Sequence, residues 1–166
     1  MHPRHVLAIA FLLVTTFGLV AGQTSAKYTW TVFSALNAAQ DVAFDPDGRL
    51  WIATTGGVVG SRVNDSGVVF RTSDGLLSLN STAIDIDPLS GDMYVGGQDG
   101  TISIRRADGR WTYSTEIAAL SEHPARRIND FEFGARGVYV ATSFGVGLYD
   151  PHDSVFRESY LRFDPW

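Results

Sequence analysis

Few residues of this 166-residue chain combine a type and a spacing suited to catalysis or metal binding. Beyond the apolar N-terminal segment the histidines are His123 and His152, and each stands beside a proline. A zinc site or a Ser/His/Asp triad needs several such groups in a matched arrangement, and the chain has no cysteine to add a thiolate. Nucleophile-elbow and phosphate-loop patterns do not occur in the sequence. We therefore expect a chain that is not an enzyme, with no catalytic residue, no metal and no cofactor.

Asp45 and Asp47 are spaced as the first ligands of a calcium loop, and Gly48 follows them. Carboxylates at alternate positions can converge on one hard cation. The later ligands of such a loop are missing, because the chain continues into Arg49 and an apolar strand. Aspartate also accepts hydrogen bonds from the amides of its own turn, so the sequence favours a capped hairpin turn.

Asp85 and Asp87 project to one face of a strand, as a glycosidase pair would. Asp41 and Asp130 occupy the place of Asp85 in two other copies of a repeated pattern. A residue that recurs with the repeat favours a structural role over a catalytic one.

That pattern occurs three times, with a period near 44 residues. Trp51, Tyr94 and Tyr139 each begin a strand that ends in a glycine pair or its equivalent, and positions 51, 94 and 139 are 43 and 45 residues apart. Four strands and their turns occupy such a length, which is typical of a β-propeller blade. Glycine-containing turns interrupt the pattern every few residues, which excludes helical repeats.

The sequence therefore predicts an all-β fold, a partial β-propeller of about three four-stranded blades at residues 38–72, 82–114 and 128–160. Residues 28–33 are expected to form an N-terminal closing strand. Three blades cannot close a ring, because known propellers begin at about four. We expect the rest of the ring to come from further sequence or from self-association.

Aromatic residues recur at the same period, which favours a core between blades over a sugar-stacking surface. They are Trp30, Trp51, Phe70, Tyr94, Trp111, Tyr139 and Phe156.

The N-terminus predicts export. Arg4 precedes an apolar run at residues 6–20 that is short for a membrane span, so residues 1–22 are expected to be a signal peptide, cleaved after Gly22 or, as the alternative, after Ala26. No second apolar run follows. Loss of Arg4 moves the net charge from −5 to −6 (12 basic against 18 acidic residues), which disfavours nucleic-acid partners. We expect the periplasm or cell surface of a Gram-negative bacterium.

Two stretches resemble known propellers. Residues 41–58, with an Asp-Pro-Asp-Gly turn before Leu-Trp-Ile-Ala-Thr, resemble the two-component regulator propeller repeat. Residues 72–76, 128–130 and 139–146 are similar to the N-terminal propeller of PorZ-like proteins, although a second propeller and a C-terminal sorting domain are not within this sequence. The PorZ resemblance implies a noncatalytic surface protein of type IX secretion, with anionic lipopolysaccharide or a secretion-system protein as partner.

Two alternatives remain open. The first is the ligand-sensing ectodomain of a two-component regulator, and the weaker second is a propeller hydrolase or lyase.

Propeller geometry places a binding surface where the turns between second and third strands meet the connections between blades, and residues 73–80 and 115–127 are the longest connections. The candidate ligand-binding residues are Thr55, Gln98, Asp99, Phe144, Arg126 and Arg127. Together with Arg105 and Arg106, the two arginines are a candidate basic patch for an anionic glycan.

Overall fold

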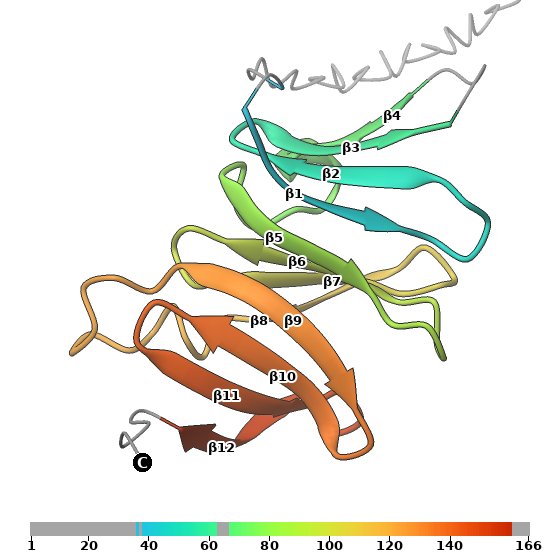
Figure 1. Cartoon of the computed structure of the whole chain (residues 1–166). Coiled ribbons are helices and arrows are strands. Elements are labelled where there is room, and N and C mark those ends of the chain that lie inside the picture. The colour runs from blue at the N-terminus through green and yellow to red at the C-terminus, as the bar shows by residue number, and fades with distance from the viewer. Residues whose placement is uncertain (1–35, 37, 63–66, 161–166) are drawn as a thin grey trace, which may run out of the picture.

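The computed structural model describes residues 36, 38–62 and 67–160 (Figure 1). The predicted signal peptide and the predicted closing strand at residues 28–33 lie outside them. Within the described part of the chain, no helix has the length and apolar character that crossing a membrane requires.

Three four-stranded antiparallel sheets follow one another along the chain, each with its strands in sequence order. The strands are β1 (Ala39–Phe44), β2 (Leu50–Thr54), β3 (Gly57–Ser61), β4 (Val68–Phe70), β5 (Ser81–Ile86), β6 (Met93–Gly97), β7 (Ile102–Arg105), β8 (Trp111–Ser114), β9 (Ile128–Gly134), β10 (Gly137–Thr142), β11 (Gly145–Asp150) and β12 (Val155–Tyr160). A short 3-10 turn, η1 (Thr72–Asp74), lies between the first two sheets. The predicted propeller-like, all-β fold is confirmed for these three sheets.

Tight turns end the strands where the sequence places glycine. Gly48 has φ 77° and Gly57 has φ 121°, a backbone region that side-chain-bearing residues rarely adopt. At Gly57 a Cβ would also lie 2.3 Å from the carbonyl oxygen of Phe70. The β2–β3 hairpin therefore requires glycine at this position.

One hydrogen bond recurs in all three sheets and fixes the start of the innermost strand. The amides of Thr55, Gln98 and Ser143 donate to carbonyls just before β1, β5 and β9, at 3.3, 3.0 and 3.0 Å. Each innermost strand also has a register shift near its first residues. We call the end of the sheets that carries the β2–β3, β6–β7 and β10–β11 turns and the β4–β5 and β8–β9 connections the turn face; it lies at the left in Figure 1.

Two hydrophobic clusters hold the sheets together, one at each junction. At the first junction Trp51 stacks on Phe70, with ring centroids 5.5 Å apart, and the rings of Phe70 and Trp111 lie nearly perpendicular, also with centroids 5.5 Å apart. At the second, Tyr94 packs on Phe131 at 5.8 Å. Burial of these rings is the main stabilising term between blades.

Most of the predicted inter-blade aromatics within the described residues lie in these clusters: Trp51, Phe70, Tyr94, Trp111 and Phe156. Tyr139 differs from its equivalents and is only half-buried. Trp51 and Tyr94 face the following sheet, whereas no sheet among the described residues follows the one that holds Tyr139. Trp30 lies outside the described residues.

Candidate functional site

Four of the candidate residues lie at the tips of turns on the turn face. Thr55, Gln98 and Asp99 are exposed, and Phe144 is half-buried. Asp99 Oδ1 accepts hydrogen bonds from the amide and, at 2.7 Å, the hydroxyl of Thr101. The structure therefore gathers these side chains at one end of the three sheets.

The β2–β3 and β10–β11 hairpin tips are each held by the threonine that precedes them. Thr54 Oγ1 donates to the carbonyl of Gly57 at 2.8 Å and accepts from the amide of Gly56 at 3.0 Å. Thr142 Oγ1 makes the equivalent bond to Gly145, at 2.8 Å, and accepts from Phe144 N at 3.2 Å. These bonds fix the direction in which each tip presents its side chains.

Arg126 and Arg127 also lie at the turn face, but each has a partner within the chain. Arg126 Nη1 donates to the carbonyls of Ala118 and Leu120 at 2.6 and 3.3 Å, and so shapes the β8–β9 connection. Arg127 Nη1 reaches Gln40 Oε1 of the first sheet at 3.5 Å. Arg127 is therefore the arginine of this pair that a partner could reach with least rearrangement.

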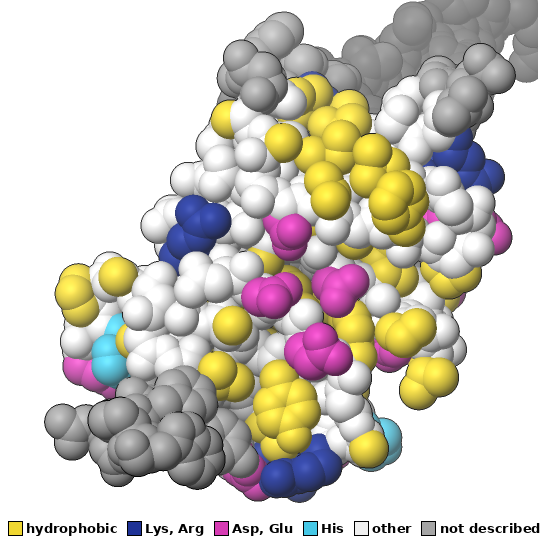
Figure 2. Space-filling view, viewed as in Figure 1, with side chains coloured by type: hydrophobic (Ala, Val, Ile, Leu, Met, Phe, Trp, Pro, Cys, Tyr) yellow, Lys and Arg dark blue, Asp and Glu magenta, His cyan; other side chains and the backbone are white. Residues whose placement is uncertain are grey.

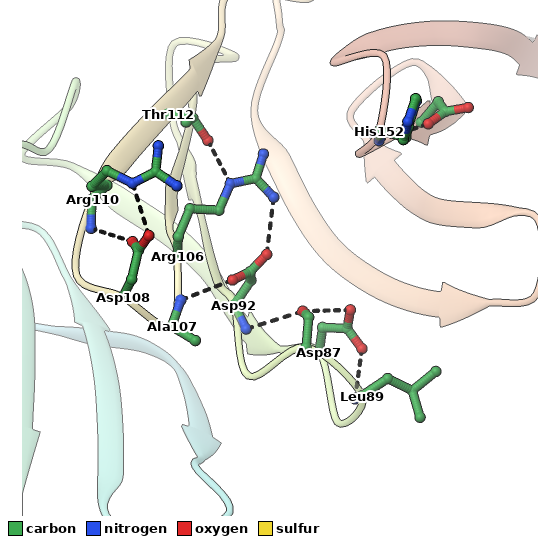
Figure 3. A network of polar contacts seen from close by, with 11 residues as sticks. Asp87, Leu89, Asp92, Arg106, Ala107, Asp108, Arg110, Thr112 and His152 are labelled. Carbon is green, nitrogen blue, oxygen red and sulfur yellow. Dashed lines mark hydrogen bonds and ion pairs between the residues drawn. The ribbon is translucent and has the colours of Figure 1, made fainter.

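The four arginines considered as a basic patch do not form one cluster. Arg105 ends β7 at the opposite end of the sheets from the turn face, and its guanidinium lies 5.1 Å from the ring centre of Phe70. Figure 3 shows the network of Arg106: its guanidinium donates to Asp92 at 2.9 Å and to Thr112 at 3.1 Å. The repeat period does not indicate that Arg105 and Arg106 lie apart from Arg126 and Arg127. The separation depends on which end of its strand each arginine occupies.

Asp45 has the predicted turn-capping role. Its Oδ1 accepts from the amide of Arg49 at 2.8 Å, and its Oδ2 accepts from Trp51 Nε1 at 3.0 Å. Partial burial would raise the pKa of Asp45, but these hydrogen bonds outweigh burial and hold the pKa below its usual value. No group of three or more His, Asp or Glu residues within the described ranges could hold a metal ion.

Asp85 belongs to a column of carboxylates on the innermost strands β1, β5 and β9, which also contains Asp41, Asp130 and Glu132. Acidic side chains run down the middle of the view in Figure 2. Burial raises the pKa of Asp85, and the negative charges of Asp130, Asp41 and Glu132 raise it further. Asp41, Asp85 and Asp130 each accept a hydrogen bond from the following amide, at 2.8, 2.8 and 2.9 Å. Asp41 also accepts from Ile84 N of the next sheet at 2.9 Å, so this copy of the recurring aspartate joins the first and second sheets.

Asp87 is not a partner for Asp85. It caps the β5–β6 turn, where its oxygens accept from Leu89 N at 2.9 Å and from Ser90 Oγ at 2.7 Å (Figure 3). Asp85 and Asp87 therefore do not form the carboxylate pair of a glycosidase.

The two histidines lie at opposite ends of the third sheet. His152 is exposed and bonded to Asp153 at 2.7 Å, and this carboxylate raises the pKa of His152. His123 stacks on Phe144, with ring centroids 4.0 Å apart and planes 3° from parallel. His123 is thereby part of the turn face, in the connection between the second and third sheets.

A cavity of about 260 Å³ opens beside this stack, between the β8–β9 connection and the third sheet. We call it the junction cavity. Phe144, Val146 and Phe156 line it from the third sheet, and Ile117 and Leu120 line it from the connection, with Glu116, Glu122 and His123. Of the candidate residues only Phe144 belongs to the lining. For the other lining residues, the only indication in the sequence was the length of the connection at residues 115–127.

Comparison with known proteins places the fold. No protein-family profile matches the chain, and no curated protein matches it in sequence. PorZ, an essential bacterial surface component of the type-IX secretion system of Porphyromonas gingivalis, is similar in structure, with a TM-score of 0.70 and 16% identity over 79% of this chain.

Two regulatory proteins of B. thetaiotaomicron are similar as well. The extracellular domain of the putative one component system BT4673 has a TM-score of 0.64 and 17% identity over 83% of this chain. That of the putative hybrid two component system BT3049 has a TM-score of 0.59 and 18% identity over 75%. The chain covers 18%, 18% and 17% of PorZ, BT4673 and BT3049. The predicted resemblance to PorZ-like and two-component regulator propellers is confirmed at the level of fold.

Proposed function

We propose that this chain is part of a noncatalytic, exported binding module of the PorZ kind, which presents its turn face to a partner at the surface of a Gram-negative bacterium. Proteins with similar structures are a surface component of a secretion system and extracellular domains of regulators, which supports binding or sensing over catalysis.

The arrangement of polar side chains at the two ends of the sheets carries the proposal. At the opposite end, charged groups pair with one another, as Asp92 does with Arg106 and Asp108 with Arg110 (Figure 3). At the turn face, Thr55, Gln98 and Asp99 stand exposed on rigid turns. Connections held on a rigid scaffold are where binding residues concentrate.

For the partner we propose an anionic lipopolysaccharide, with Arg127 as its point of contact. A guanidinium binds phosphate or carboxylate groups through charge-assisted hydrogen bonds. Thr55, Gln98 and Asp99 add neutral and acidic hydrogen-bonding groups on the same turn face.

The test is binding of the chain to immobilised anionic lipopolysaccharide. Arg127→Gln is expected to weaken binding about three- to tenfold. Arg110→Gln removes the same charge from an exposed side chain at the opposite end and is expected to leave binding unchanged. Equal losses in the two variants would reduce the effect to net charge and contradict the assignment of the turn face. If the chain binds a secretion-system protein and does not bind lipopolysaccharide, the proposed glycan partner is wrong.

The regulator structures favour a second candidate, the ligand-sensing ectodomain of a two-component regulator. The coding sequence after codon 166 distinguishes the two. A second propeller and a sorting domain support the first proposal, whereas a membrane span followed by a histidine kinase supports the second and contradicts the first.

A further inference from the structure

The two junctions between sheets come from the same repeat but differ at the turn face. At the first junction the β4–β5 connection is fastened down, because Leu77 N donates to Ser103 Oγ of β7 at 2.9 Å. Trp111 closes the remaining space. Its ring lies so near Gly75 that a Cβ there would be 2.4 Å from Trp111 Cδ1. This junction is filled by its own side chains.

The second junction lacks both closing devices. Register places Gly147 opposite Val140 where Ser103 stands opposite Val95, so no side-chain hydroxyl is available there to hold the connection. Phe156 stands in the place of Trp111, and its ring lies against Gly147, where a Cβ would be 2.7 Å from the ring. The connection at residues 115–127 is longer than that at residues 71–80. The junction cavity is the space that results.

We propose that the junction cavity binds a small organic cation, a single aromatic ring or branched aliphatic group that carries an ammonium; the proposal rests on the proposed binding function of the turn face. A cavity of about 150 Å³ holds benzene, so about 260 Å³ has room for one ring and a short chain. Ile117, Val146 and Phe156 supply an apolar lining.

The charge of the lining selects a cation. Glu116 and Glu122, two acidic and exposed residues, are among the residues that line the cavity. The aromatic face of Phe144, held in place by its stack on His123, also attracts positive charge. The guanidinium of Arg126, in the same connection, donates to the carbonyls of Ala118 and Leu120 and does not line the cavity. An anionic ligand would meet repulsion at this site.

The experiment titrates the full chain with phenethylammonium and follows it by calorimetry and by amide chemical shifts. We expect saturable binding with a dissociation constant near or below about 1 mM and shifts centred on Ile117, Leu120 and Val146. 2-Phenylethanol should bind about tenfold more weakly and phenylacetate more weakly still, because they lack the positive charge. Ethylammonium, which lacks the ring, should not saturate.

Variants separate the two parts of the site. The double change Glu116→Gln and Glu122→Gln is expected to weaken phenethylammonium about tenfold and to leave 2-phenylethanol unchanged. Phe144→Ala should weaken both. Glu132→Gln, in the carboxylate column, is the control for net charge and should change neither. Because Glu116 and Glu122 are exposed, their replacement keeps the fold even if Phe144→Ala does not.

Three results would overturn the proposal: no saturable binding of phenethylammonium, equal binding of phenylacetate, or an equal loss in Glu132→Gln. Lipopolysaccharide binding that depends on Arg127 would still stand in each case, so the failure of this inference is distinct from failure of the proposed function.

Discussion

Asp45 uses both carboxylate oxygens within its own hairpin. The amide of Arg49 and the indole of Trp51 each donate to it, so the turn is joined to a ring that belongs to the inter-sheet core. Asp47, two residues later, has a side chain 84% exposed and only an ion pair with Arg62 at 3.3 Å. We therefore expect Asp45 to contribute more than Asp47 to the free energy of unfolding.

Asp45→Ala is expected to lower the free energy of unfolding by about 1–3 kcal/mol, because two buried or half-buried donors lose their acceptor. Asp47→Ala is the matched control, with an expected change of about 0–1 kcal/mol. The folded-state pKa of Asp45 is lowered, so its contribution is present above the unfolded-state value of about 3.9 and is lost as pH falls through the folded-state pKa. Urea unfolding at neutral and acidic pH measures both effects. Equal losses in the two variants would refute this role.

At the scale of strands, close approach between sheets depends on small residues at defined positions. Gly96 of β6 lies against Ile128 of β9, where a Cβ would be 2.4 Å from Ile128 Cγ2. Gly48, in the β1–β2 turn, has φ 77° and no atom within 4 Å of where a Cβ would be. One glycine is required by packing and the other by backbone conformation.

Gly96→Ala is expected to destabilise the chain by about 1–3 kcal/mol through overpacking. Ile128→Ala in the same chain should recover part of that loss, because it removes Cγ2 and Cγ1, at 2.4 and 3.2 Å; the Cβ of residue 128, at 2.5 Å, remains, so recovery is incomplete. Gly48→Ala should cost about 1 kcal/mol through its left-handed backbone, with no recovery from Ile128→Ala. A double-mutant cycle by thermal unfolding checks this, and additive losses for Gly96 and Ile128 would contradict the packing explanation.

At the scale of the molecule, the innermost strands of the three sheets lie side by side and carry a column of like charges. Asp85 is in the centre of this column, because its strand β5 packs against β1 with Asp41 on one side and against β9 with Asp130 on the other. Above the column in Figure 2, hydrophobic side chains gather over the first sheet, where Val42 and Phe44 are 55% and 68% exposed. The column is held by inter-blade packing in spite of its own repulsion.

Asp85→Asn is expected to raise the free energy of unfolding at neutral pH by about 1 kcal/mol, because it replaces a carboxylate that burial and neighbouring like charges both disfavour and keeps an acceptor for Ile86 N. The folded-state pKa of Asp85 is raised, so its ionised form is penalised above that pKa. The advantage of the variant should shrink as pH falls toward about 3.9, where both states bind the proton. Asp47→Asn removes one charge away from the column and should give no gain. A destabilised Asp85→Asn in denaturant unfolding would contradict this view.

Three four-stranded sheets, their turns and most of the aromatic core could be predicted from the sequence. This was possible because strand alternation, glycine turns and the near-44-residue period are local properties that recur. The role of Asp45 in its turn followed for the same reason.

The candidate site, in contrast, depends on contacts between segments that are far apart in the sequence. Whether Arg126 is available depends on carbonyls of its own connection, and Tyr139 differs from Trp51 and Tyr94 because no described sheet covers it. The junction cavity depends on Gly147, Phe156 and the path of a connection from the preceding sheet. The cavity exists because the second junction is less completely filled than the first. The residues that line it are distant in sequence and meet only when the sheets pack together.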